Sequence, residues 1–247
     1  MEQKGINLSQ DQIDFYYENG YLHLKKVFTE EQCLSLIDEA DQFADGHFTN
    51  YLNMHKTGLF QEIHTGKNLC DIGDQILGKR AIPVGSIFFF CKPNNPLENG
   101  STWHQDNYAS RAPMNAYLNL ALSLDNADDS NGALMVVPKS HKLGDLPCNP
   151  KPNFSYDENG KMYNSAPIGN DCELPEGLPI VQLSYERGDV LALHAHTVHK
   201  ALKNPHPTKW RRTMYFVYIK DNEPFWPGWT AKRELLDRYD APNKGKQ

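Results

Sequence analysis

The segment from Ala116 to Leu124 most constrains the fold, because polar and apolar residues alternate along it. Tyr117, Asn119 and Ser123 stand between leucines at positions 118, 120 and 122. A period of two is typical of a β-strand whose two faces meet different surroundings. Other strand-like segments are expected at residues 84–91, 134–137, 180–183, 189–193 and 213–219. Together they predict antiparallel sheets with one face lining a cavity.

Two helices are expected before these strands. The segments Ser9–Gln12 and Thr29–Gln32 both match the capping box that begins a helix. After the second box, apolar residues recur at helical spacing, at positions 33, 36, 37, 40, 43 and 44. Between the helices, Asn19-Gly20 predicts a turn into a short strand at 21–24 and 27–28. The fold class is therefore mainly β with flanking helices.

At 247 residues the chain is long enough for one sizeable core, so we expect a single domain over residues 1–247. Residues 1–80 form its mainly helical part, residues 81–220 its core and residues 221–247 a tail. From 143 to 178 the periodicity disappears, and Pro, Asn, Gly and charged residues dominate. A structureless, lid-like insert is expected there.

Charge and composition exclude several classes of function. With 25 Lys+Arg against 31 Asp+Glu, the net charge of −6 disfavours nucleic acid as a partner. The start of the chain lacks the apolar stretch of a signal peptide, and no segment offers the roughly 20 apolar residues of a membrane span. Five scattered cysteines without CxxC spacing argue against a disulfide framework or a zinc ribbon. We expect a cytoplasmic monomer or homodimer.

The segment Trp103-His104-Gln105-Asp106 carries the chemistry. Side chains at i and i+2 of a strand point to the same face, so His104 and Asp106 can converge on one metal while Gln105 points away. Imidazole and carboxylate together suit Fe(II), and a distant second histidine would complete the ligand set. Alone, the pair equally fits a structural histidine hydrogen-bonded to a nearby aspartate.

Several further motifs appear in order along the chain and carry a family resemblance. They are Phe15–Leu22, Trp103–Asp106, Leu124-Asp125, Asn131–Leu134, Pro138–His141, Gly188–Leu191, His199, Asn204 and Arg211-Arg212. From about Ile6 to Lys220 the chain thus resembles the phytanoyl-CoA dioxygenase family of Fe(II)/2-oxoglutarate oxygenases. One departure is Lys139, which stands where the family usually has glycine.

The resemblance implies a double-stranded β-helix core, the jelly roll shared with cupins, and an iron site. His104, Asp106 and His199 match the family's metal ligands, with His196 as the alternative to His199. His194 and His196 would line the cavity or form hydrogen bonds inside it.

The resemblance also implies a cosubstrate site. Arg211 would bind the distal carboxylate of 2-oxoglutarate through its planar guanidinium. Arg212 remains the alternative, because neighbouring residues of a strand face opposite ways. Tyr117, Asn119 and Ser123 are candidate cosubstrate contacts, although their alternation equally suits a strand that faces solvent.

With Fe(II), 2-oxoglutarate and O2, the family's reaction hydroxylates a C–H bond and releases succinate and CO2. We expect an aliphatic carbon of a small-molecule metabolite or natural-product intermediate as the substrate. Related halogenases carry Ala or Gly in place of Asp106, which favours hydroxylation, or alternatively desaturation or cyclisation, over halogenation here. The alternative is a non-oxidative, cupin-like protein that binds a metal or small molecule, or an isomerase.

Candidate substrate contacts can be inferred only from their position in the sequence, near the metal motif or in the tail. Arg111 and Lys92 would suit an anionic substrate, whereas Phe225, Trp226 and Trp229 could form an apolar or cation-binding lid. The same aromatic residues could instead only attach the tail to the core.

Overall fold

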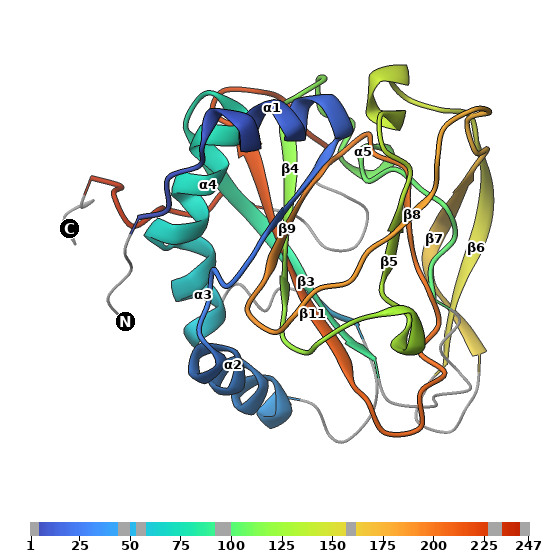
Figure 1. Ribbon diagram of the computed structural model, residues 1–247, viewed down its shortest axis with the longest axis horizontal. Helices are drawn as coiled ribbons and strands as arrows, with labels where there is room; N and C mark the ends of the chain where they lie inside the picture. Colours follow the sequence, from blue (N-terminus) through green and yellow to red (C-terminus); the bar gives the residue numbers. More distant parts are fainter. Residues whose placement is uncertain are drawn as a thin grey trace.

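The computed structural model describes residues 5–43, 50–52, 58–91, 100–156, 162–226 and 234–242. Two antiparallel sheets form its centre (Figure 1). The larger has the order β1-β9-β4-β11-β3-β2, with bounds β1 Tyr21–Leu24, β2 Asn50–Leu52, β3 Ala81–Cys91, β4 Tyr117–Ser123, β9 Val190–His194 and β11 Arg211–Lys220. The smaller has the order β10-β5-β8, with bounds β5 Leu134–Val136, β8 Val181–Gln182 and β10 His199–Ala201.

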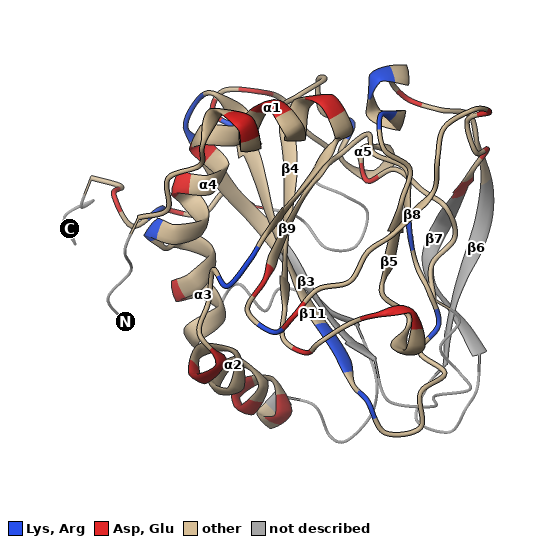
Figure 2. Cartoon of the chain, viewed as in Figure 1, with Lys and Arg blue, Asp and Glu red and all other residues tan. Residues whose placement is uncertain are grey.

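Helices cover the outer face of the larger sheet (Figure 1). They are α1 Gln10–Asn19, α2 Glu30–Phe43, α3 Gly58–Thr65 and α4 Lys67–Leu77. Both predicted capping boxes are present: Ser9 and Gln12 bond reciprocally before α1, and Thr29 and Gln32 do so before α2. Figure 2 shows acidic residues along these helices. No helix among the described residues is long and apolar enough to span a bilayer.

The two faces of β4 and its neighbours in the larger sheet serve different cores. Leu118, Leu120 and Leu122 pack with the helices in the largest apolar cluster. The opposite face meets the smaller sheet, where Ala121 packs against Leu134 and other apolar residues. The predicted alternation along β4 is therefore correct, but every residue of the strand is buried. The two facing sheets form the predicted jelly-roll core.

The segment expected to lack structure contains a long β-hairpin. Strands β6 Cys148–Tyr156 and β7 Met162–Cys172 pair with each other in a separate two-stranded sheet, preceded by the short helix η3 Ser140–Leu143. The prediction of a structureless insert was wrong because it relied on the absence of apolar periodicity. A hairpin outside the main sheets is held by backbone pairing, which leaves little periodicity in the sequence.

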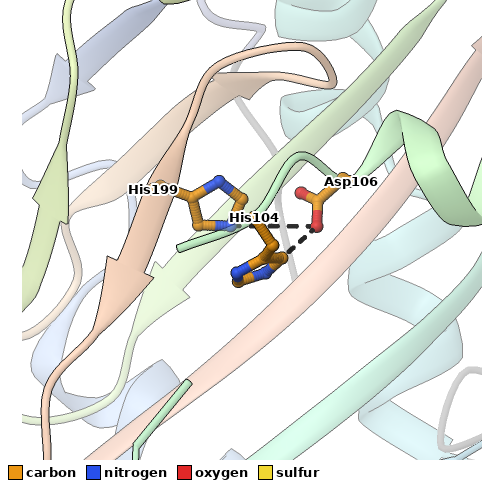
Figure 3. A group of neighbouring side chains, drawn as sticks. All are labelled: His104, Asp106 and His199. Carbon is orange, nitrogen blue, oxygen red and sulfur yellow. Dashed lines mark ion pairs between the residues drawn. The ribbon is translucent and has the colours of Figure 1, made fainter. Parts of the chain in front are cut away.

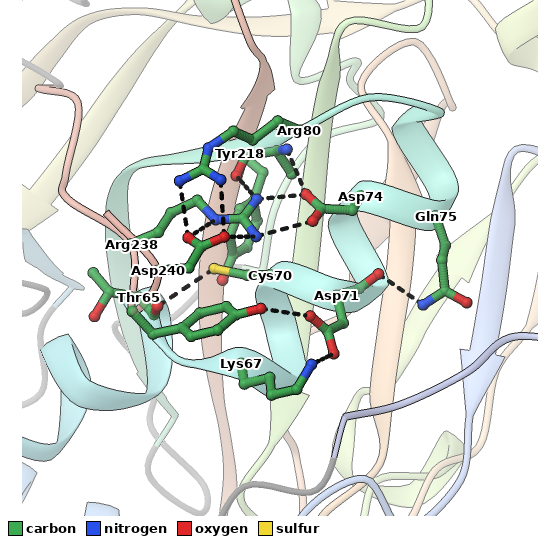
Figure 4. A network of polar contacts seen from close by, with 12 residues as sticks. Thr65, Lys67, Cys70, Asp71, Asp74, Gln75, Arg80, Tyr218, Arg238 and Asp240 are labelled. Atoms are coloured by element: carbon green, nitrogen blue, oxygen red, sulfur yellow. Dashed lines mark hydrogen bonds and ion pairs between the residues drawn. The ribbon is translucent and has the colours of Figure 1, made fainter. Parts of the chain in front are cut away.

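The end of the chain is anchored on the helical side. Arg238 donates hydrogen bonds to Asp74 on α4, to Asp240 and to the carbonyl of Ala81 (Figure 4). Arg80 holds Asp240 from the other side through two hydrogen bonds of 2.8 Å. Residues 234–242 are thus fixed against α4.

Candidate metal centre

Backbone pairing brings the two predicted ligand segments together. His104 and His199 form an antiparallel bridge in which each amide donates to the other's carbonyl at 3.0 Å. Their rings lie with centroids 4.2 Å apart. Asp106 follows at the N-cap of the short helix α5 (Asn107–Ser110), which turns its carboxylate back toward the rings. The three ligand atoms lie within 4.8 Å of one another (Figure 3).

Both imidazoles are oriented by a carbonyl two residues earlier in the chain. Nδ1 of His104 lies 2.8 Å from the Thr102 carbonyl, and Nδ1 of His199 lies 2.9 Å from that of Thr197. Since a carbonyl only accepts, each Nδ1 carries the proton and each Nε2 presents a lone pair. Those Nε2 atoms lie 3.7 and 3.8 Å from the same oxygen of Asp106. Such fixed donor sets are typical of metal sites.

The electrostatics keep the buried histidine in its metal-binding form. Burial and, to a smaller extent, the neighbouring His104 lower the pKa of His199 to about 4, although Asp106 and the Thr197 carbonyl oppose the shift. A neutral imidazole is the form that binds a metal. Two neutral nitrogens and one carboxylate could hold a divalent cation.

Asn119 lies beside the carboxylate. Its Nδ2 donates a hydrogen bond to Oδ2 of Asp106, the oxygen that does not face the histidines. Asn119, predicted as a cosubstrate contact, therefore lies where it orients Asp106, a candidate metal ligand. A hydrogen bond of this kind fixes the carboxylate rotamer and leaves Oδ1 facing the rings.

The other two histidines of the His194–His199 segment have separate partners. Nε2 of His194 lies 2.9 Å from the side-chain oxygen of Asn115, and its Nδ1 accepts from the backbone of His196. Nε2 of His196 lies 3.3 Å from Asp145. His199 alone of the three joins the metal-ligand group among the described residues.

The two adjacent arginines face opposite ways. Arg212 forms a two-pronged ion pair with Asp125, at 2.7 and 2.8 Å. Arg211 is buried, and its Nη1 donates to the carbonyl of Gly132. By strand alternation Arg211 shares a face with Thr213, on the side away from the helices. Thr213 lines a small cavity between the sheets.

The other predicted cosubstrate contacts, Ser123 and Tyr117, lie on the inner face of β4, whereas the predicted substrate contacts lie elsewhere. Ser123 lines the same cavity, but its hydroxyl donates to the Asp125 carbonyl at 2.6 Å. Tyr117 is buried in an apolar cluster with Val217 and Ala195. Near α5, Arg111 stacks on Trp226 and Phe225 packs on the same cluster. Lys92 and Trp229 lie outside the described residues.

Gln105 was expected only to point away from the metal. Its part in connecting the ligand segments through hydrogen bonds was not predicted. Its side chain is buried and donates to the carbonyls of Gly144 and His196, while its oxygen accepts from Leu146. It thus connects both ligand segments to the base of the β6–β7 hairpin. A glutamine between two polar ligands gives little signal in the sequence. The two carbonyl supports of the histidine rings gave no signal either, because every residue has a backbone carbonyl.

The sequence model of the Phytanoyl-CoA dioxygenase (PhyH) family matches residues 16–213, which is most of the chain and includes the whole triad. The chain belongs to the phytanoyl-CoA dioxygenase family. Phytanoyl-CoA dioxygenase 1 from Oryza sativa subsp. japonica is 25% identical over 215 residues, covering 87% of this chain and 68% of the rice protein.

Solved structures share the fold of this member of the phytanoyl-CoA dioxygenase family. The non-heme alpha ketoglutarate dependent carbocyclase SnoK from nogalamycin biosynthesis has a TM-score of 0.69 and 18% identity, over 91% of this chain and 88% of SnoK. EctD from S. alaskensis has a TM-score of 0.68 and 18% identity, over 95% of this chain and 85% of EctD. At such identities the likeness shows the jelly-roll fold alone.

Proposed function

We propose that this chain is an Fe(II)- and 2-oxoglutarate-dependent dioxygenase that hydroxylates an aliphatic C–H bond of a small-molecule metabolite or natural-product intermediate. One observation carries the proposal: Nε2 of His104 and of His199 face the same oxygen of Asp106, at 3.7 and 3.8 Å. Two imidazoles and one carboxylate are the ligand set that leaves three positions of Fe(II) open for cosubstrate and oxygen.

The residues fit the metal because each ligand has a support that opposes its rotation. Carbonyls of Thr102 and Thr197 hold the two rings, and Asn119 holds Asp106. Bound iron would supply the oxidative chemistry, in which O2 and 2-oxoglutarate are converted with the substrate to succinate, CO2 and an alcohol. The protein's own part is to bind, orient and exclude water.

Arg211 is the proposed partner of the distal carboxylate of 2-oxoglutarate. Its guanidinium is buried on the inner face of the larger sheet, where a charge-assisted hydrogen bond to a carboxylate is strong. Arg212 is disfavoured, since Asp125 occupies its guanidinium. Thr213 and Ser123 line the cavity on the same face and are further candidate contacts.

Structures of relatives support the choice of metal and cosubstrate. EctD from S. alaskensis has been solved with bound Fe, and with 2-oxoglutarate and 5-hydroxyectoine. The epimerase SnoN has been solved in complex with Fe3+, alpha ketoglutarate and nogalamycin RO. These proteins share a fold and cofactors but differ in reaction, so the hydroxylation proposed here needs a direct test.

The test is succinate release from 2-oxoglutarate by Fe(II)-loaded protein against a library of small metabolites, with mass detection of a product 16 Da heavier. We expect turnover in the wild type and in His196→Ala, and its loss in His199→Ala. Iron binding without affinity for 2-oxoglutarate would overturn the proposal and favour the non-oxidative binding protein or isomerase.

A further inference from the structure

We infer that Arg111 and Trp226 form a binding site for an anionic group of the substrate, a carboxylate or a phosphate. The inference rests on the proposed function, because it assigns a substrate class to the same site. Four features of the described residues lead to it: an unneutralised charge, an unusual backbone conformation, an aromatic support and a position next to the metal centre.

The charge of Arg111 is not neutralised by a carboxylate of the described chain. Within the described part of the chain, its guanidinium lies over the ring of Trp226, with Cζ 5.0 Å from the ring centroid. Four other arginines bind aspartate or glutamate, namely Arg80, Arg187, Arg212 and Arg238, whereas the buried Arg211, the proposed 2-oxoglutarate partner, donates to the Gly132 carbonyl. In a chain with a net charge of −6, a cation left available in this way is suited to an external anion.

The backbone holds Arg111 where glycine is usual. Its φ is 49°, in the left-handed region at the C-cap of α5. Its amide donates to the Asn107 carbonyl at 2.7 Å, and the next amide, of Ala112, donates to the Asn107 side chain at 3.0 Å. A side chain in this region costs conformational energy that glycine avoids. Residues kept in such conformations cluster at ligand sites.

Trp226 fixes the direction of the guanidinium. The amide of Trp226 donates to the carbonyl of Ser110 at 2.5 Å, so the start of the tail is attached to α5 itself. An arginine that stacks on an indole ring keeps its N–H groups at the edge of the guanidinium. Those donors can then bind a carboxylate or phosphate in a two-pronged manner with little loss of side-chain entropy.

The position relates the site to the reaction. Arg111 directly follows α5, and Asp106 is the N-cap of the same helix. The two residues are five positions apart, which is about 7.5 Å along a helix axis. A substrate bound through its anionic group at Arg111 would therefore present a carbon several bonds away from that group to the metal.

The test measures binding of benzoate, phenyl phosphate and the neutral benzamide by ligand-observed NMR, under argon, to full-length protein with and without Fe(II) and 2-oxoglutarate. We expect both anions to bind more tightly than benzamide, and about tenfold weaker anion binding in Arg111→Gly, as loss of a charge-assisted hydrogen bond implies. The tighter of the two anions identifies carboxylate or phosphate as the natural group.

Arg111→Gly separates binding from folding. Because glycine is favoured at this φ, the thermal unfolding midpoint of Arg111→Gly should equal or exceed that of the wild type. Arg111→Lys should keep most of the anion affinity, and Arg187→Gln, at an arginine paired with Glu30, is the control for a lost surface charge. Equal binding of benzamide and the anions, or unchanged anion binding in Arg111→Gly, would overturn the inference. If anions bind through Arg111 but 2-oxoglutarate does not bind, the proposed function has failed and the anion site has not.

Discussion

Asn119 connects the larger sheet to a proposed ligand through one hydrogen bond to Asp106. Asn119→Ala should weaken Fe(II) binding by about tenfold, because the freed carboxylate can rotate away from the two rings. Competition with a metal indicator measures this affinity. Ser123→Ala is the control on the same strand, since its hydroxyl binds a backbone carbonyl instead, and its iron affinity should match the wild type. Equal affinity in Asn119→Ala would show that the contact does not support the metal.

His194 makes the metal-free protein sensitive to acid. Burial lowers its pKa to about 3, with smaller contributions in the same direction from His141 and His196. An unfolded histidine titrates near 6.5, so below that pH the unfolded chain binds a proton that the folded chain does not. Acidification from pH 7 to pH 5 should therefore cost about 2 kcal/mol of stability at this residue. Urea unfolding across this range should show a weaker pH dependence in His194→Gln; an unchanged slope would contradict the assignment.

The loop that carries His104 and the base of the β6–β7 hairpin depend on each other through Gln105. Gln105→Leu leaves the buried His196 carbonyl, the part-buried Gly144 carbonyl and the part-buried Leu146 amide without this partner. We expect a loss of about 2–4 kcal/mol in unfolding free energy, together with weaker iron binding. Gln182→Leu is the control, because the side chain of this half-buried glutamine on β8 donates to the carbonyl of Ala133, which lies outside the ligand segments and the hairpin. A variant at Gln105 as stable as that control would mean that the hairpin base is held by other contacts.

The C-terminal segment tests whether stability and metal binding are separable. Arg238 is buried on the helical face, where it binds Asp74 and Asp240 (Figure 4). Arg238→Gln should lower the unfolding free energy by about 3 kcal/mol, since Asp74 loses its arginine partner and Asp240 keeps only Arg80. Iron affinity, measured well below the unfolding midpoint, should stay unchanged. Loss of iron affinity in the folded variant would show that the two faces of the sheet are coupled.

At the scale of the whole molecule, the fold could be predicted from the sequence where local periodicity determines which face of a strand a residue occupies. Alternation along residues 116–124 correctly separated the helix face from the inner face. His104 and Asp106 do lie close together, but not as the i and i+2 residues of one strand: Asp106 is the helical N-cap of α5, and the turn into this helix brings its carboxylate to the rings. The β6–β7 hairpin was missed because it joins neither main sheet. The metal centre also depends on a long-range backbone contact. The pairing of His104 with His199, 95 positions apart, leaves no local trace in the sequence.

The most direct test of the central proposal is an anaerobic titration of Fe(II)-loaded protein with 2-oxoglutarate, followed by the visible charge-transfer band of the chelate. The wild type and His196→Ala should develop the band. His199→Ala should not, because it lacks a proposed ligand, and Arg211→Ala should need a higher 2-oxoglutarate concentration. Iron that binds without producing a band in the wild type would contradict the assignment of an Fe(II)/2-oxoglutarate site.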